Sequence, residues 1–137
     1  MLTKSEYLSK LTGTKRLREI ANIMKMIEAD EQAALFRWAE AFKDDYPGLE
    51  LLNGSLNGVR LSMGQAVKAK KAGMKKGFPD ISLPVPRGGY HGLFIELKIK
   101  PYRNDRGVMV YPKTSKEQMR WLLLLVSQGY RAVICKG

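Results

Sequence analysis

The fold is decided by residues 77–99, which read GFPDISLPVPRGGYHGLFIELKI. The two apolar segments of this stretch, 81–85 and 93–99, are joined by residues 86–92, which are rich in Gly and Pro. Apolar segments separated by turn formers are typical of a β-hairpin. Facing residues of an antiparallel pair have numbers that sum to a constant, and a loop centred on Gly89 makes that sum about 178. Position 80 is therefore expected to face about position 98, with Glu96 one step away on the same face.

The hairpin gathers charged side chains at one place. Glu96 and Lys98 share a strand face by alternation, and Asp80 opens the facing segment. Mg²⁺ and Mn²⁺ prefer oxygen ligands, and a bound metal activates water and polarises a phosphate. A neighbouring lysine can orient the water or stabilise phosphoryl charge. Separately, Glu-x-Lys is common on solvated strands and Pro-Asp is an ordinary turn; together they indicate metal-dependent phosphodiester hydrolysis.

The net charge of +11 is concentrated in part of the chain. Residues 1–59 carry 8 basic and 9 acidic side chains, residues 60–106 carry 11 and 3, and residues 107–137 carry 5 and 1. Two of the three acids in the middle block are Asp80 and Glu96. This pattern favours a nucleic-acid partner, although charge alone says nothing about cleavage. We expect phosphate contacts with little base readout from Arg60, Lys68, Lys71, Lys75, Lys76, Arg103 and Arg106.

The order of these motifs resembles the virus-type replication-repair nuclease (VRR-NUC) branch of the PD-(D/E)xK nuclease superfamily. The resemblance covers residues 28–137 and rests on Glu31-Gln32 before an amphipathic helix, a basic helix leading into 77–80, the 94–98 segment, and Ser115–Gln118 with Trp121. It implies an α/β fold, with a mixed β-sheet flanked by helices, and a nuclease domain at 28–137 that follows an N-terminal helical extension at 1–27. Stand-alone members of the family resemble phage-encoded enzymes that act on branched DNA.

The resemblance also implies roles for single residues. Asp80, Glu96 and the backbone carbonyl of Leu97 are expected to bind the metal, and Lys98 is the expected catalytic lysine. An additional carboxylate comes from the first shared helix, here Glu31. An active-site glutamine is expected as well, here Gln118.

Two of these positions have a structural alternative. Glu31 precedes Leu35 and Trp38 at helical spacing, which directs it towards the core side, but an acid in a first helical turn also favours the helix dipole. Gln118 completes a capping box with Ser115, and because Thr114 and Glu117 form another, Gln118 is free to point at the site.

Hydrophobic periodicity places the other elements. We expect helices at 5–11, 15–27, 28–44 and 62–72, and a helix beginning near Ser115. A short strand at 49–52, a long loop at 100–113 and a last strand at 130–135 complete the pattern. With 137 residues the chain fits one compact domain. The single Cys135 suggests a core thiol in a reducing compartment, and no apolar run is long enough to span a membrane, so we expect an intracellular protein, in the host cytoplasm if phage-encoded.

The sequence therefore predicts a Mg²⁺-dependent endodeoxyribonuclease that Mn²⁺ also supports. The resemblance and the compact single-domain length favour a homodimeric Holliday-junction resolvase of DNA repair or recombination, and a two-fold axis suits a four-way junction. One alternative is a monomeric nuclease for flaps or ends. The other is a basic DNA-binding module in which Asp80, Glu96 and Lys98 form a structural charge cluster.

Overall fold

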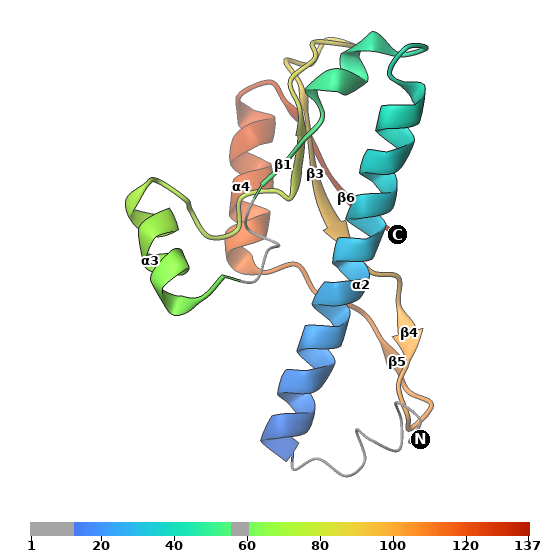
Figure 1. Ribbon diagram of the computed structural model, residues 1–137, viewed down its shortest axis with the longest axis vertical. Helices are drawn as coiled ribbons and strands as arrows, with labels where there is room; N and C mark the ends of the chain where they lie inside the picture. The colour runs from blue at the N-terminus through green and yellow to red at the C-terminus, as the bar shows by residue number, and fades with distance from the viewer. Residues whose placement is uncertain (1–12, 56–60) are drawn as a thin grey trace.

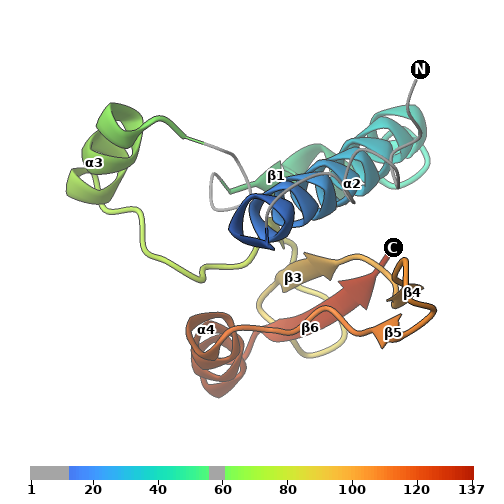
Figure 2. The same cartoon turned by 90° about the horizontal axis from the view of Figure 1, so that it is seen from below.

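A computed structural model describes residues 13–55 and 61–137 of the chain. A four-stranded sheet has the order β1-β2-β3-β6, from Asn53–Gly54, Ile81–Leu83, Leu93–Lys98 and Arg131–Lys136. β1, β2 and β3 are antiparallel neighbours, whereas β3 and β6 run parallel. Helix α2 (Gly13–Phe42) lies on one side of this sheet and α4 (Lys116–Ser127) on the other (Figure 2). The predicted mixed sheet flanked by helices is confirmed.

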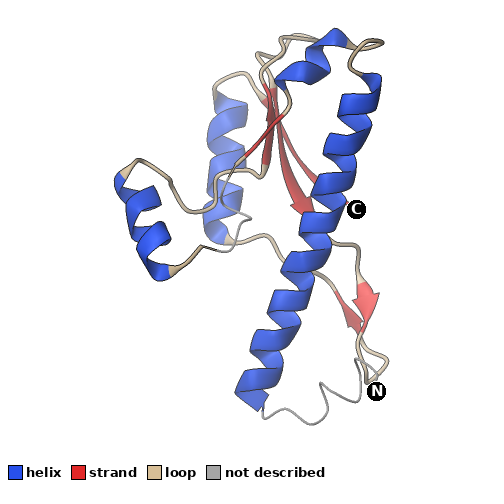
Figure 3. Cartoon of the chain, viewed as in Figure 1, coloured by secondary structure: helices blue, strands red, loops and turns tan. Residues whose placement is uncertain are grey.

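Helix α2 is continuous where the sequence suggested two helices that meet at residues 27 and 28. No Gly or Pro occurs between Gly13 and Pro47, so nothing in the backbone interrupts the turns. The predicted boundary between extension and domain falls inside this helix, and the helix expected at 5–11 lies outside the described residues. The N-terminal half of α2 extends beyond the sheet (Figure 3).

The face of α2 that meets the sheet differs from the expected one. Ala39 is buried, whereas the rings of Trp38 and Phe42 stack on each other at 5.5 Å and are 45% and 41% exposed. Gln32 and Phe36 lie against Gly54 of β1. The inner face of the helix therefore contains Gln32, Phe36 and Ala39 and not Trp38 or Phe42.

The β2–β3 hairpin has a register two residues from the expected one. Ile81 faces Ile95 and Leu83 faces Leu93, which gives a sum of 176. The turn is centred between Gly88 and Gly89, both with positive φ, inside an Arg87–Tyr90 bridge. A shift of two preserves the strand face, so the predicted grouping of Asp80, Glu96 and Lys98 on one side survives.

Strand β1 and a separate helix, α3 (Met63–Lys71), lie in sequence between η1 (Pro47–Leu51) and β2. The strand expected at 49–52 is this 3₁₀ helix, which begins with Pro47 and is followed by β1. Helix α3 (Met63–Lys71) begins where predicted, with Ser62 and Gln65 forming a capping box. It stands apart from the other helices in two perpendicular views (Figures 1 and 2).

The loop expected at 100–113 contains a small ribbon. Strands β4 (Tyr102–Arg103) and β5 (Met109–Val110) pair across a turn in which the Asn104 side chain accepts from two backbone N–H groups. The Tyr102 hydroxyl donates to Met24 Sδ at 3.6 Å, which attaches the ribbon to α2.

The last strand, β6, confirms the predicted element but not the environment of its cysteine. Cys135 is exposed, because β6 is the edge strand of the sheet. Within the described residues, no helix combines the length and apolar character needed to cross a bilayer.

Candidate active site

The loop before Asp80 is fixed against the first turn of α4. Gly77 has φ +87°, and a Cβ there would come within 2.7 Å of the Glu117 backbone carbon, so a side chain does not fit. The indole N–H of Trp121 donates to the Lys76 carbonyl at 3.1 Å. The Phe78 ring packs edge-on against Phe94 and Trp121 at 5.6 and 5.2 Å. These contacts hold the loop to both β3 and α4.

Asp80 is attached to the neighbouring strands on both sides. Its carboxylate Oδ2 accepts from the Leu97 backbone N–H at 2.8 Å, and its carbonyl accepts from the Ser55 N–H at 2.7 Å. The N–H and C=O of one strand residue point to the same side of the strand. The Leu97 carbonyl, a predicted metal ligand, therefore faces the side of β3 on which the Asp80 carboxylate lies.

Glu96 lies at the centre of the cluster and is 2% exposed. Burial and the negative charge of Asp80 raise the pKa of Glu96 to about 7. Burial also raises the pKa of Asp80, whose carboxyl group interacts with that of Glu96. Lys98 Nζ lies 3.6 Å from Glu96 Oε1, and its side chain is 11% exposed. The structure thus brings together the three residues that the hairpin pattern singled out.

Gln118 reaches the same carboxylate from α4. Its amide Nε2 donates to Glu96 Oε1 at 2.5 Å, while its Oε1 accepts from the Ser115 N–H at 2.8 Å. The Ser115 hydroxyl in turn accepts from the Gln118 N–H at 3.1 Å. Capping the helix and contacting the site do not exclude each other, because the Gln118 side chain does both. The cap fixes the amide oxygen and so aims the amide nitrogen at Glu96.

Among the acids of α2, Glu28 is the one whose charge interacts with Asp80 and Lys98. Burial raises the pKa of Glu28, with Lys98 opposing and Asp80 adding to the shift, and its carboxylate accepts from the Ile99 backbone N–H. Glu31 is exposed and lies beside Gly137, where a Cβ would come within 2.8 Å of Glu31 Oε2. The expectation that Glu31 faces the core side is wrong, because the buried face of α2 contains Ala39 and not Trp38.

Sequence reasoning missed Glu28, although a signal was present. Glu28, Gln32 and Ala39 recur at i, i+4 and i+11, which places them on one face of a helix. Gln32 lies against Gly54 of β1, where a Cβ would come within 2.8 Å of its Nε2. A buried face defined by Ala39 instead of Trp38 includes Glu28.

The donor set fits a divalent cation. Two neighbouring carboxyl groups repel each other once both are ionised, and a cation between them relieves that repulsion; the charge of Asp80 already raises the pKa of Glu96. In the parts of the chain that the structure describes, no three Asp, Glu, His or Cys side chains are close enough to hold a metal by themselves. Mg²⁺ commonly takes one or two carboxylates and completes its shell with water and substrate phosphate, so the two carboxylates of Asp80 and Glu96 are sufficient.

The cations predicted to contact DNA occupy two sides of the molecule. α3 and the loop after it carry Lys68, Lys71, Lys75 and Lys76, whereas the β4–β5 ribbon carries Arg103 and Arg106; all six are exposed. α3 and the ribbon lie on opposite sides of α2 and the sheet (Figure 1). Arg60 lies outside the described residues.

Comparisons with known proteins identify the family of the chain. The family model described as the VRR-NUC domain matches residues 15–137. A solved structure of a VRR-NUC domain protein is 28% identical and superposes with a TM-score of 0.58, and the match covers 80% of this chain and 77% of the other. No curated protein sequence matches significantly.

Proposed function

The chain belongs to the VRR-NUC family of nucleases, and on that premise we propose that it is a divalent-metal-dependent endonuclease that hydrolyses phosphodiester bonds in branched DNA. The observation that carries the proposal is the grouping of the interacting Asp80 and Glu96 carboxyl groups beside Lys98. A buried carboxyl pair with a raised pKa is an unfavourable arrangement for stability alone and is characteristic of functional sites.

In this proposal Asp80, Glu96 and the Leu97 carbonyl hold Mg²⁺ or Mn²⁺. Glu28 replaces Glu31 as the additional carboxylate, and it acts through its charge on Asp80 and Lys98 and not as a third carboxylate ligand of the metal. When bound, the metal supplies an activated water and polarises the scissile phosphate. Gln118 keeps Glu96 Oε1 in one orientation through its 2.5 Å hydrogen bond.

Lys98 has the role of acting on the water and the phosphate. Its ammonium group lies 3.6 Å from Glu96 and is nearly buried, so its charge is poorly screened by solvent. A cation in this position orients the attacking water and stabilises the charge that develops on the phosphoryl oxygens. We assign no general-base role to His91, which lies at the other end of β3 and packs edge-on against Tyr130 at 5.7 Å.

DNA binding through phosphates is supported by the charge of the α3 segment. Between Glu50 and Asp80 the sequence contains no acidic residue, and α3 carries three lysines in its last turn. Lysine is a point charge without base-reading geometry, so these contacts position the duplex and do not select a sequence.

We further propose that two copies act together on a four-way junction in the cell, each copy cutting one strand. The support is the approximate two-fold symmetry of such a junction. The stacked, half-exposed Trp38 and Phe42 on α2 also offer apolar surface to a second copy.

The experiment is cleavage of a labelled immobile four-way junction, a flap and a plain duplex in Mg²⁺, Mn²⁺ or EDTA. Lys98→Ala is run in parallel and is expected to keep DNA binding but lose hydrolysis by a factor of about 10² or more. Metal-dependent paired nicks across the junction, absent in the variant, support the full proposal. Cleavage of flaps alone by a monomer would contradict the junction substrate and the dimer. Tight binding without cleavage in any metal would contradict catalysis, and the protein would then be a DNA-binding module.

A further inference from the structure

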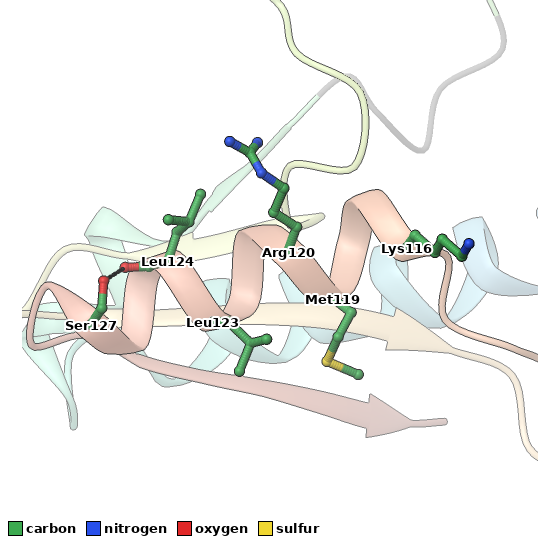
Figure 4. Close-up of a pocket in the computed structure, with 6 residues that line it drawn as sticks. All are labelled: Lys116, Met119, Arg120, Leu123, Leu124 and Ser127. Atoms are coloured by element: carbon green, nitrogen blue, oxygen red, sulfur yellow. Dashed lines mark hydrogen bonds between the residues drawn. The ribbon is translucent and has the colours of Figure 1, made fainter.

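Helix α4 carries an apolar stripe on its outer face. Six residues at helical spacing line an open groove of about 450 Å³ along this face (Figure 4), namely Lys116, Met119, Arg120, Leu123, Leu124 and Ser127. Leu123 is 63% exposed and Leu124 42%. We call this surface the outer stripe of α4.

The outer stripe is more apolar than a solvated helix face requires. Residues 121–126 read WLLLLV, so this part of the helix is apolar all round. The sheet covers only the inner side, where Leu122 is buried at 6% exposure. A helix that is apolar on every face is normally covered on every face, and an exposed apolar patch beside polar residues marks an interaction surface.

Charge determines which occupant fits. Lys116 and Arg120 lie in the stripe one helical turn apart, and no acidic side chain lines the groove. Arg120 sits close to the middle of α4, so a second copy packed antiparallel on this face would bring two Arg120 side chains together. Like charges brought together in an apolar interface oppose such a pairing. DNA is also disfavoured, because the phosphate backbone offers Leu123 and Leu124 no apolar partner.

We propose that the outer stripe of α4 is a docking site for an amphipathic helix of a partner protein, one that carries acidic side chains beside its apolar row. Its leucine-type side chains fill the groove between Met119, Leu123 and Leu124, and its carboxylates pair with Lys116 and Arg120. Helix-in-groove recognition of this kind uses anchors at i, i+3, i+4 and i+7. The inference stands on the surface of α4 and does not rest on nuclease activity.

The test is fluorescence anisotropy of a labelled synthetic peptide titrated with the full chain. The peptide has leucines at i, i+3, i+4 and i+7 and glutamates beside them, and a second peptide has lysines in place of the glutamates. Saturable binding is expected for the acidic peptide only. Arg120→Glu is expected to weaken it at least about tenfold, and Leu123→Gln with Leu124→Gln to abolish it.

Two matched variants separate the stripe from general effects. Arg37→Glu changes the net charge by the same amount as Arg120→Glu, but at an exposed position of α2. Leu51→Gln removes an apolar side chain of η1 that is 52% exposed. Both are expected to bind the acidic peptide as the wild type does. The proposal is overturned if the acidic peptide does not bind, or if Arg37→Glu weakens it as much as Arg120→Glu. It is also overturned if sedimentation shows that the double leucine variant turns a dimer into a monomer, because a second copy is then the occupant.

Discussion

Glu96 is costly to ionise in the folded chain. Its pKa is raised from 4.5 to about 7 because it is buried and faces Asp80. Between these two pH values the folded chain binds more protons than the unfolded chain, so the free energy of unfolding falls as pH rises through this window. The loss is on the order of 3 kcal/mol at most, at about 1.4 kcal/mol for each pKa unit.

We therefore expect wild type in EDTA to melt at a lower temperature at pH 8 than at pH 5. Glu96→Gln removes the titration and is expected to lose much less stability over the same range. Differential scanning calorimetry at the two pH values measures this directly. Adding Mn²⁺ at pH 8 is expected to raise the melting temperature of wild type and not that of the variant. An equal loss for both proteins would show that another group dominates.

Gly77 connects the Asp80 loop to α4 at the level of single atoms. Gly77→Ala forces a Cβ against the Glu117 and Gln118 backbone, which displaces the cap that orients Gln118. Gly73→Ala is the matched control: Gly73 also has positive φ, at +104°, but nothing lies within 4 Å of its Cβ position. We expect Gly73→Ala to cost about 1 kcal/mol from backbone strain alone, and Gly77→Ala to cost more and to lower kcat as well. Comparable stability and kcat in the two variants would contradict a role for this contact.

The trio of Asp80, Glu96 and Lys98 could be predicted from sequence because alternation along a strand is insensitive to an even shift of register. The predicted and observed sums, about 178 and 176, leave each side chain on the same face. The two hydrogen bonds of the Gln118 amide, one with Ser115 and one with Glu96, could not be predicted, since the second depends on how α4 approaches β3.

At the scale of the element, the phase of α2 decides which carboxylate serves the site. A helix turns by about 100° per residue, so Glu31 is turned by about 60° around the axis from Glu28 and is exposed where Glu28 is half-buried. We expect Glu28→Gln to weaken Mn²⁺ binding by about tenfold, and Glu31→Gln to leave it close to wild type. Isothermal titration calorimetry of Mn²⁺ separates them. If Glu31→Gln has the larger effect, the assignment to Glu28 is wrong.

Long helices and short ribbons also differ in how well sequence defines them. Apolar side chains along α2 fit more than one packing face, and only contact with the sheet selects Ala39 over Trp38. The β4–β5 ribbon has two residues in each strand, too few for alternation to be visible. The first residues of α3 and α4 can be predicted from sequence because each helix begins with a local capping box.

The whole molecule presents two separated groups of cations to a substrate. α3 with its following loop and the β4–β5 ribbon lie on opposite sides of the body (Figure 1). A DNA contacting both groups must extend across the molecule, as the arms of a branched substrate do. A short duplex lying on one group would leave the other in solvent. Salt dependence of binding distinguishes these arrangements, because each phosphate contact releases counterions.

We expect Lys68→Gln with Lys71→Gln, and separately Arg103→Gln with Arg106→Gln, to reduce the salt slope for junction binding by about 2 each. The combined variant is expected to lose the sum, because the two groups do not touch and their effects add. The control pair is Arg87→Gln with Arg131→Gln, two exposed cations near the start of β3, at the far end from Lys98. The measurement is anisotropy of labelled junction and duplex in EDTA over a range of salt. A slope that responds to the α3 pair but not to the ribbon pair would mean that only one side binds DNA, and a junction engaged across the molecule would then be excluded.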